Sequence, residues 1–367
     1  MSRDPQTSPV TLTDPRPPDA LPVKPVHVTP PQLLDRGYVS SNACKSCHPD
    51  QFDSWHHSYH RSMTQVASPE TVTAPFEGEV RFRGQTAHLE RRGDEFWVDM
   101  VDPLWEIQQF DQGQDVSYTA DPPRVKERVV MTTGSHHFQV FWVRSQFGRE
   151  LWQFPWRYHF VEKRWVHRLN VFREPPEMRP GEGFRVWNRG CIGCHAVAGK
   201  PGMNLATGDM INTSVVELGI ACEACHGPGG RHVEMYSSSL AKKNDDETNP
   251  LDTGIVNPAK ISAERSAQIC GACHSQFVVH DSDQFLTQGL DFRPGEDITK
   301  AGYFMQPSDE GESVASRFWA DGVSRSGGRE YMGMTDSKCY QGGELSCLNC
   351  HSMHKYEDRS DQLRSEE

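Results

Sequence analysis

The chain has 367 residues, of which 36% are hydrophobic, and its formal charge at neutral pH is −12. This acidic balance argues against nucleic acid and anionic lipid as partners, because both would repel a negative surface, and it favours positively charged proteins. No apolar run approaches the ~18 to 20 residues of a membrane-spanning helix. The hydrophobic fraction is low for a chain of this length, so side chains alone leave a small core.

Residues 1–37 begin with MSRDPQTSPVTLTDPRPPDALPVKPVHVTPP, a stretch rich in proline and polar residues. This composition predicts an extended arm or linker rather than a packed element. The stretch lacks the apolar centre of a signal peptide. If the protein is exported, we expect its precursor to begin upstream, or its export signal to have been removed.

Ten of the 11 cysteines form five Cys-x-x-Cys-His units. In chain order, and numbered here as sites 1 to 5, the units are Cys44, Cys47 and His48; Cys191, Cys194 and His195; Cys222, Cys225 and His226; Cys270, Cys273 and His274; and Cys347, Cys350 and His351. This is the attachment signature of a c-type haem, in which the cysteines form thioethers and the histidine ligates the iron. A zinc ribbon or a redox dithiol does not explain a histidine after every pair. A disulfide framework does not suit an odd number of cysteines in a chain of this length. The sequence predicts five covalently attached c-type haems, whose apolar rings supply the missing core.

The five units divide the chain unevenly. We expect a first haem segment at residues 38–74, a β-rich module at 75–175, and a four-haem segment at 176–367 that forms one unit with the first. In the module, VRFRGQTAHLERRGDEFWVDMVD predicts two antiparallel strands joined at Arg92-Gly93-Asp94. After residue 176, recurrent glycine and proline predict short helices and irregular loops. The expected fold class is α+β, with the module covering one face of the haem cluster.

A low-spin electron carrier needs a sixth iron ligand, whereas a catalytic iron keeps that position open. Twelve of the 17 histidines lie outside the five units. A helix over DQFDSWHHSYHRSM would place His56 and His60 on one stripe, and His60 is the better ligand candidate there. His232 follows a Gly-Pro-Gly-Gly turn, and His354 lies one turn beyond the fifth unit, so both can reach a neighbouring haem. Further distal candidates, with hydrogen bonding as the alternative role, are His136, His137 and His280.

The stretch GGREYMGMTDSKCYQGGE precedes the fifth unit and holds the leftover cysteine, Cys339. Arg329 could hold an anion, Tyr331 could move a proton, and the Cys339 thiolate could ligate iron or carry sulfur. The favoured interpretation of Cys339 is a buried small hydrophobic side chain, the usual state of a free cysteine. Two functions stay open: an electron relay, and a multihaem oxidoreductase acting on a small nitrogen or sulfur compound.

The stretches CHPDQFDSWHHSYHRSM, ACEACHGPGGRHV and LSCLNCHSMH together resemble multihaem cytochromes of the cytochrome c554 and c-prime type, over about residues 38–355. The resemblance implies a periplasmic or cell-surface electron-transfer protein with mostly bis-histidine haems in close-packed pairs. It also implies His60, His232 and His354 as distal ligands. Ammonia-forming nitrite reductases are similar in carrying five haems, but their catalytic haem uses a Cys-x-x-Cys-Lys unit. We expect a relay between redox protein partners, and a homo-oligomer is an open alternative.

Overall fold

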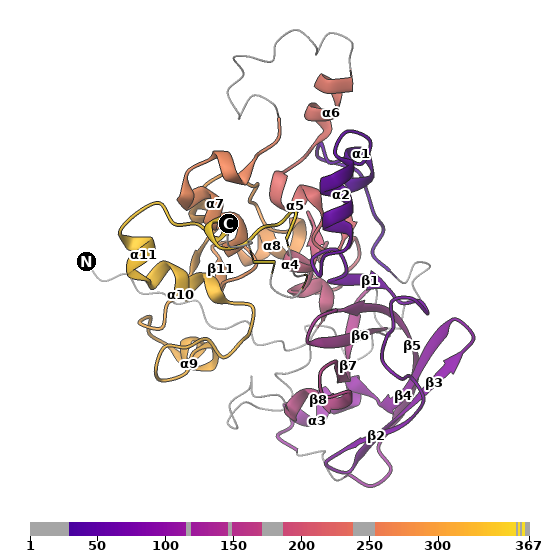
Figure 1. The fold of residues 1–367 in the computed structure, drawn as a ribbon. Coiled ribbons are helices and arrows are strands. Elements are labelled where there is room, and N and C mark those ends of the chain that lie inside the picture. Colours follow the sequence, from indigo (N-terminus) through magenta and orange to yellow (C-terminus); the bar gives the residue numbers. More distant parts are fainter. Residues whose placement is uncertain are drawn as a thin grey trace.

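The computed structural model describes residues 29–114, 119–145, 149–170, 186–237, 254–356, 359 and 362–363. Within these ranges, an antiparallel sheet forms one side of the molecule, and short helices with irregular loops form the other (Figure 1). The first helices, α1 (Ser41–Cys44) and α2 (Pro49–His56), lie in the helical part beside segments that follow the sheet in sequence. The arrangement confirms the expected α+β class. Most of the expected N-terminal arm, residues 1–28, lies outside the described residues.

The sheet is a meander in which each strand pairs with the next one along the chain. Its strands are β2 (Gly78–Phe82), β3 (Gln85–Arg92), β4 (Glu95–Val101), β5 (Arg124–Thr133), β6 (Phe138–Arg144), β7 (Leu151–His159) and β8 (Arg164–His167), while β1 (Thr64–Val66) pairs with β5. One helix that the sequence patterns did not predict, α3 (Pro103–Asp111), connects β4 to β5. The expectation of an antiparallel sheet between sites 1 and 2 is confirmed, and the sheet begins earlier, at β1.

The first part of the sheet contains one more strand than expected. The predicted hairpin at Arg92-Gly93-Asp94 is present, with Arg92 opposite Glu95. A second two-residue hairpin turns at Arg83 and Gly84, whose φ angles are 46° and 78°. Positive φ at both central residues is the turn geometry that matches the twist of two-residue hairpins. The prediction of two strands here is therefore wrong, because the chain forms three.

The two faces of the sheet have different partners. One face is packed with aromatic and aliphatic side chains of the module itself, among them the fully buried Phe141 and Phe154. A second cluster joins Trp142 of β6 to Trp187 and to Ile192, a residue inside the second unit. Burying one such side chain stabilises the fold by ~1.5 to 3 kcal/mol. The sheet therefore supports site 2 directly.

A buried ion pair also fixes the segment before site 2 to the sheet. Arg189 of η3 (Trp187–Arg189) donates to one carboxylate oxygen of Glu150 at 2.8 Å, and Trp152 donates to the other at 3.0 Å. Arg189→Met removes the cation from a buried carboxylate, so we expect a loss of ~3 to 5 kcal/mol in unfolding free energy. Guanidinium denaturation would measure it. Arg164→Met, which breaks the exposed pair with Glu162, should cost under ~1 kcal/mol, and equal costs would contradict the prediction.

The helical part is made of short elements. They are α4 (Ile192–His195), α5 (Cys222–His226), α6 (Gly230–Ser237), α7 (Ala263–Gly271), α8 (Ser282–Gln288), α9 (Glu312–Arg317), α10 (Glu330–Asp336) and α11 (Lys338–Gln341), with the strand pairs β9 (Ala196–Val197) and β10 (Glu217–Leu218), and β11 (Phe277–Val279) and β12 (Gly302–Phe304). The longest helices in the described ranges have nine residues, which agrees with the sequence expectation. None of the described helices is long and apolar enough to cross a membrane.

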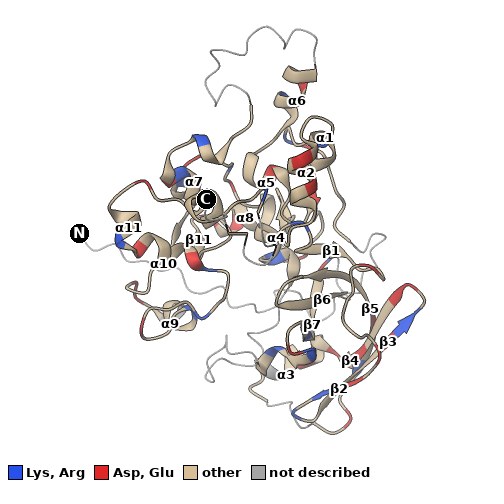
Figure 2. Cartoon of the chain, viewed as in Figure 1, with Lys and Arg blue, Asp and Glu red and all other residues tan. Residues whose placement is uncertain are grey.

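Lys or Arg and Asp or Glu positions are interspersed along the hairpins of the sheet (Figure 2). Glu90, for example, accepts hydrogen bonds from both Arg92 and Lys126, at 2.6 Å from each nearest nitrogen. The described surface of the module is thus a mixture of paired charges rather than the continuous basic stripe that typifies nucleic-acid binding.

Candidate haem-binding sites

The five units share one backbone conformation. In site 1 the N–H of His48 donates to the carbonyl oxygen of Cys44 at 2.9 Å, and sites 2, 4 and 5 repeat this bond at 2.9, 2.8 and 2.9 Å. Site 3 lies entirely within α5. One helical turn brings the first cysteine, the second cysteine and the histidine to the same side of the backbone. Five copies of one local geometry are expected if all five units hold the same kind of group.

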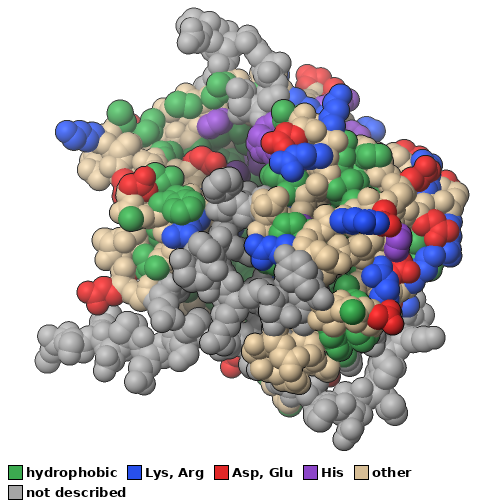
Figure 3. Space-filling model, turned by 90° about the horizontal axis from the view of Figure 1, so that it is seen from below, with side chains coloured by type: hydrophobic (Ala, Val, Ile, Leu, Met, Phe, Trp, Pro, Cys, Tyr) green, Lys and Arg blue, Asp and Glu red, His purple; other side chains and the backbone are tan. Residues whose placement is uncertain are grey.

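Three of the unit histidines face a histidine from a distant part of the chain. The pairs are His48 with His232, with ring centroids 6.3 Å apart; His226 with His354, at 6.3 Å; and His274 with His60, at 6.2 Å. A metal–imidazole bond is ~2.0 Å long and the ring centre lies ~1.1 Å beyond the nitrogen, so two imidazoles on opposite sides of one metal have centroids ~6.2 Å apart. The spacing of all three pairs therefore fits a ligated iron. Histidine side chains also border a hollow on one face of the molecule (Figure 3).

Second contacts orient two of these rings. His226 donates from Nδ1 to the carbonyl oxygen of Val256 at 2.6 Å, and His274 donates from Nδ1 to Glu330 Oε2 at 3.2 Å. Such bonds set the tautomer and leave Nε2 available for a metal. Burial, with a smaller effect from His274, lowers the pKa of His60 to about 4. His60 is therefore neutral at physiological pH, which is the form that ligates metals.

The attachment cysteines of different units touch one another. Cys44 of site 1 lies against Cys222 of site 3. The other contacts join Cys194 of site 2 to Cys273 of site 4, and Cys270 of site 4 to Cys347 of site 5. Cys225 of site 3 also lies near enough to both cysteines of site 4 to raise their pKa values. All five sites therefore form one connected set, and site 4 adjoins sites 2, 3 and 5.

The sequence profile of the cytochrome c554 and c-prime family matches residues 43–84 and 175–227, which contain sites 1, 2 and 3. These are the two segments that the structure joins through Cys44 and Cys222. The chain is a multihaem c-type cytochrome. It also resembles the crystal structure of outer cell wall cytochrome OcwA, with a TM-score of 0.54 and 15% sequence identity over 90% of this chain and 65% of that one. The cytochrome thus spans less than two thirds of that protein's length. No curated protein matches it in sequence.

His60 reaches site 4 of the cytochrome by a route that differs from the one expected. The helix predicted over residues 50–63 ends at His56, so His56 and His60 do not share a helical stripe. The indole of Trp55 donates to the carbonyl oxygen of Ile220 at 2.9 Å, and the N–H of Ile220 donates to the carbonyl oxygen of His60 at 2.9 Å. A side-chain hydrogen bond from Gln362 completes the surroundings of His60. Long-range contacts, rather than helical periodicity, therefore place this ring.

Gly219 makes that route sterically possible. Its φ is +79°, and a Cβ atom there would lie 2.4 Å from the carbonyl oxygen of Arg61. We expect Gly219→Ala to lower the unfolding free energy by ~2 to 4 kcal/mol, through strain and through displacement of the loop that carries His60. The same variant should also lose part of the low-spin absorbance of one haem. Gly78→Ala, at φ +91° with open space around the new Cβ, should cost ~1 kcal/mol and leave the haem spectrum unchanged.

Glu223 is a functional residue that the sequence did not indicate. It occupies a variable position inside the third unit, and its side chain is 2% exposed. Its carboxylate accepts hydrogen bonds from the backbone N–H groups of Val39 at 3.0 Å, Ser40 at 2.8 Å and Gly229 at 2.7 Å. The first two precede α1 and site 1. Glu223 therefore joins the first haem segment to the third site, and no spacing rule could have revealed it.

The remaining distal candidates have other contacts. The rings of His136 and His137 stack at 3.9 Å, and His136 also stacks on Tyr59 at 4.4 Å. These contacts bring the sheet against the first haem segment. The Nε2 atom of the exposed His280 is 3.0 Å from the carbonyl oxygen of Thr299, which is the hydrogen-bonding alternative for this residue.

The three catalytic candidates do not share one environment. Arg329 donates to the carbonyl oxygen of Cys273 and contacts the sulfur of Cys194. Tyr331 is buried against Phe304, with ring centroids 4.4 Å apart. Cys339 lies in α11 and is exposed on the polypeptide, so the expectation of a buried side chain is wrong. The four-residue α11 leaves its side chain outside the four described apolar clusters.

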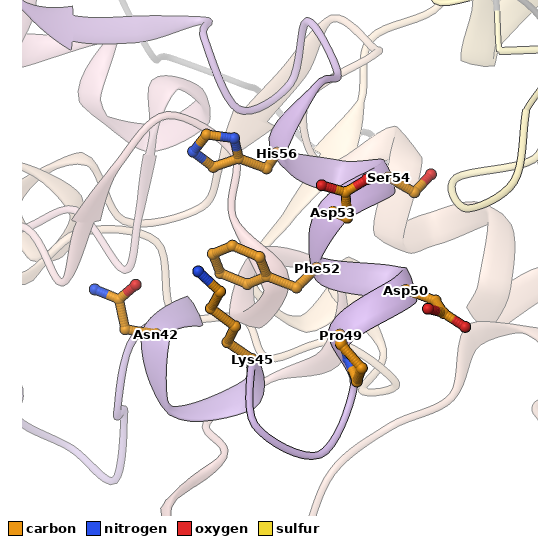
Figure 4. A pocket seen from close by; sticks show the side chains of 8 residues that line it. All are labelled: Asn42, Lys45, Pro49, Asp50, Phe52, Asp53, Ser54 and His56. Carbon is orange, nitrogen blue, oxygen red and sulfur yellow. The ribbon is translucent and has the colours of Figure 1, made fainter.

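An open cavity of about 700 Å³ lies along one face of the first two helices (Figure 4). Its lining consists of Asn42, Lys45, Pro49, Asp50, Phe52, Asp53, Ser54 and His56. Their side chains come only from α1, α2 and the turn between these helices. None of the unit cysteines or unit histidines borders it, although Lys45 belongs to the first unit.

Proposed function

We propose that the cytochrome carries five covalently attached haems and relays single electrons between redox partners. Each unit supplies two cysteine sulfurs and one histidine, and three distant histidines supply second ligands at sites 1, 3 and 4. Bound haem would supply reversible one-electron chemistry at iron. The protein's own contribution is to hold the sites in place, shield them from water and set their potentials.

The single observation that carries this proposal is the set of three imidazole pairs at 6.2 to 6.3 Å. Each pair joins residues from different segments, so the spacing does not follow from local backbone geometry. If two histidines held the iron at each of sites 1, 3 and 4, no position there would be free for a substrate, which suits a carrier. The contacts among attachment cysteines support the same role, because a relay needs neighbouring sites that adjoin one another.

The proposed location is the periplasm or the outside of the cell. Covalent haem attachment is typical of those compartments, and the similar solved structure is described as an outer cell wall cytochrome. The formal charge of −12 does not count the acidic propionates that each haem adds. We therefore expect the electron donor or acceptor to present a positively charged surface, with association that weakens as salt rises.

A second candidate function rests on site 2. Within the described residues, the ring of His195 contacts no other aromatic ring, and burial followed by Arg329 lowers its pKa to about 4. A haem held there without a second protein ligand would be open to a small nitrogen or sulfur compound. Arg329, beside Cys194, would then supply an anion-binding group.

Low-temperature EPR of the fully oxidised cytochrome separates these candidates. Total haem is first measured by the pyridine haemochrome assay, and the spin-quantified signals are divided by it. We expect five haems per chain with low-spin signals from at least three of them. Five low-spin haems support the relay alone, whereas one high-spin haem that turns over nitrite or hydroxylamine supports the second candidate. High-spin signals from most of the haem would contradict the proposed ligation.

A further inference from the structure

Two consecutive residues of opposite charge, Arg329 and Glu330, reach different haem sites. They lie at the start of α10 (Glu330–Asp336), directly after a glycine with φ +71°. The relay described above gives neither residue a role, because neither one attaches or ligates a haem. Their contacts indicate one.

Glu330 is directed to site 4. One carboxylate oxygen accepts from His274 Nδ1 at 3.2 Å, and the other accepts from the backbone N–H of Gly328 at 3.1 Å. Both oxygens are therefore held, although the side chain is 73% exposed. A carboxylate on the outer nitrogen of a metal-bound histidine raises the basicity of the ligand. A more basic ligand favours the oxidised metal, so this bond lowers the reduction potential at site 4.

Arg329 is directed to the boundary between sites 4 and 2. Its guanidinium donates to the carbonyl oxygen of Cys273 and contacts the sulfur of Cys194, and its Nε atom is buried with no hydrogen-bond partner in the described part of the chain. It also lies close enough to the buried His195 to disfavour a second positive charge there. A fixed cation in a poorly solvated place favours the form with one more electron. Arg329 lies against both a cysteine and the histidine of site 2, whereas its contact with site 4 is with Cys273, so it raises the reduction potential mainly at site 2.

We propose that Arg329 and Glu330 set the reduction potentials of sites 2 and 4 apart, with site 4 the lower, so that electrons pass from site 4 toward site 2. Both residues act as positioning residues, because neither touches iron. The inference rests on the proposed function, since it assumes that His60 and His274 share an iron. Cys194 and Cys273 are in contact at this boundary, so the two sites adjoin where the charges differ.

A redox titration followed by EPR tests the inference on the intact, haem-loaded cytochrome. The imidazole planes at site 4 are 68° apart, against 25° and 16° at sites 1 and 3, so site 4 should give a separate, more anisotropic low-spin signal. In Glu330→Gln we expect reduction at that signal to become about tenfold more favourable, an upward shift of ~59 mV for one electron. In Arg329→Gln we expect a downward shift of similar size in the midpoint potential of a different haem, one that does not give the anisotropic signal.

Control variants separate the effect of a lost charge from that of a disturbed fold. Asp336→Asn removes a carboxylate from the far end of the same helix and should leave every step unchanged, while Glu330→Asp and Arg329→Lys keep the charges and should restore most of each shift. An unchanged site 4 midpoint in Glu330→Gln, with its low-spin signal intact, would overturn the inference and leave the relay standing. If His60→Ala leaves the anisotropic signal in place, the proposed ligation itself fails. The two failures are therefore distinguishable.

Discussion

Replacement of His232 by alanine is expected to convert one haem of the five from low-spin to high-spin. The His232 ring lies 6.3 Å from that of His48, and the described structure places no other histidine opposite site 1. Loss of the sixth ligand leaves an iron that water or a small ligand can occupy. EPR should show a new high-spin signal from about one fifth of the total haem, with the low-spin signals reduced to match. Cyanide or imidazole should then bind to one site per chain.

Alanine at His354 should convert the haem at site 3 to high-spin, and alanine at His60 should do the same at site 4. The low-spin signal lost with His60 should be the anisotropic one, because only that pair is near-perpendicular among the three. His280→Ala is the matched control: it removes an exposed histidine whose ring nitrogen faces a backbone carbonyl, and the spectrum should not change. If alanine at His232 leaves all five haems low-spin, a ligand other than His232 must complete site 1.

Local patterns in the sequence predicted much of the architecture. The spacing of each unit depends on one helical turn, and the five turns have the expected backbone hydrogen bonds. Alternating aromatic and β-branched residues predicted the antiparallel sheet. His232 and His354 follow their units closely, and each does lie opposite the histidine of a different unit. In these cases the information lies within about ten residues.

Features that depend on distant contacts were not predictable. Helix α2 ends at His56, and His60 meets His274 because Ile220 and Gly219 hold the loop between them. No periodicity contains that information. The exposure of Cys339 likewise depends on where α11 lies in the folded chain, not on its residue type. The assignment of each distal candidate to a particular site therefore required the structure.

Replacement of Glu223 by alanine is expected to separate sites 1 and 3. The carboxylate accepts hydrogen bonds from three backbone N–H groups, and its removal leaves one buried donor and two partly buried donors without a partner. The buried donor costs ~1 to 3 kcal/mol and the partly buried ones less, so we expect a loss of ~2 to 4 kcal/mol in the free energy of unfolding. Cys44 and Cys222 depend on the same contact to meet, so haem content should fall below five per chain, with sites 1 and 3 affected first. Guanidinium denaturation and the pyridine haemochrome assay measure the two effects.

Two further variants show whether stability depends on the negative charge of Glu223 or only on the volume of its side chain. Glu223→Gln keeps the volume and one acceptor oxygen but places N–H donors against N–H donors, so it should be destabilised nearly as much as the alanine variant. Glu296→Gln removes an exposed carboxylate that accepts a single local bond from Arg293 at 3.1 Å, and it should differ from the unchanged protein by less than ~1 kcal/mol. A Glu223→Ala protein with unchanged stability and five haems would show that other contacts hold the first segment to site 3, among them the hydrogen bonds of Ser41 with Glu217 and Cys222. The buried carboxylate inside the third unit would then be incidental to assembly, contrary to the geometry of its three hydrogen bonds.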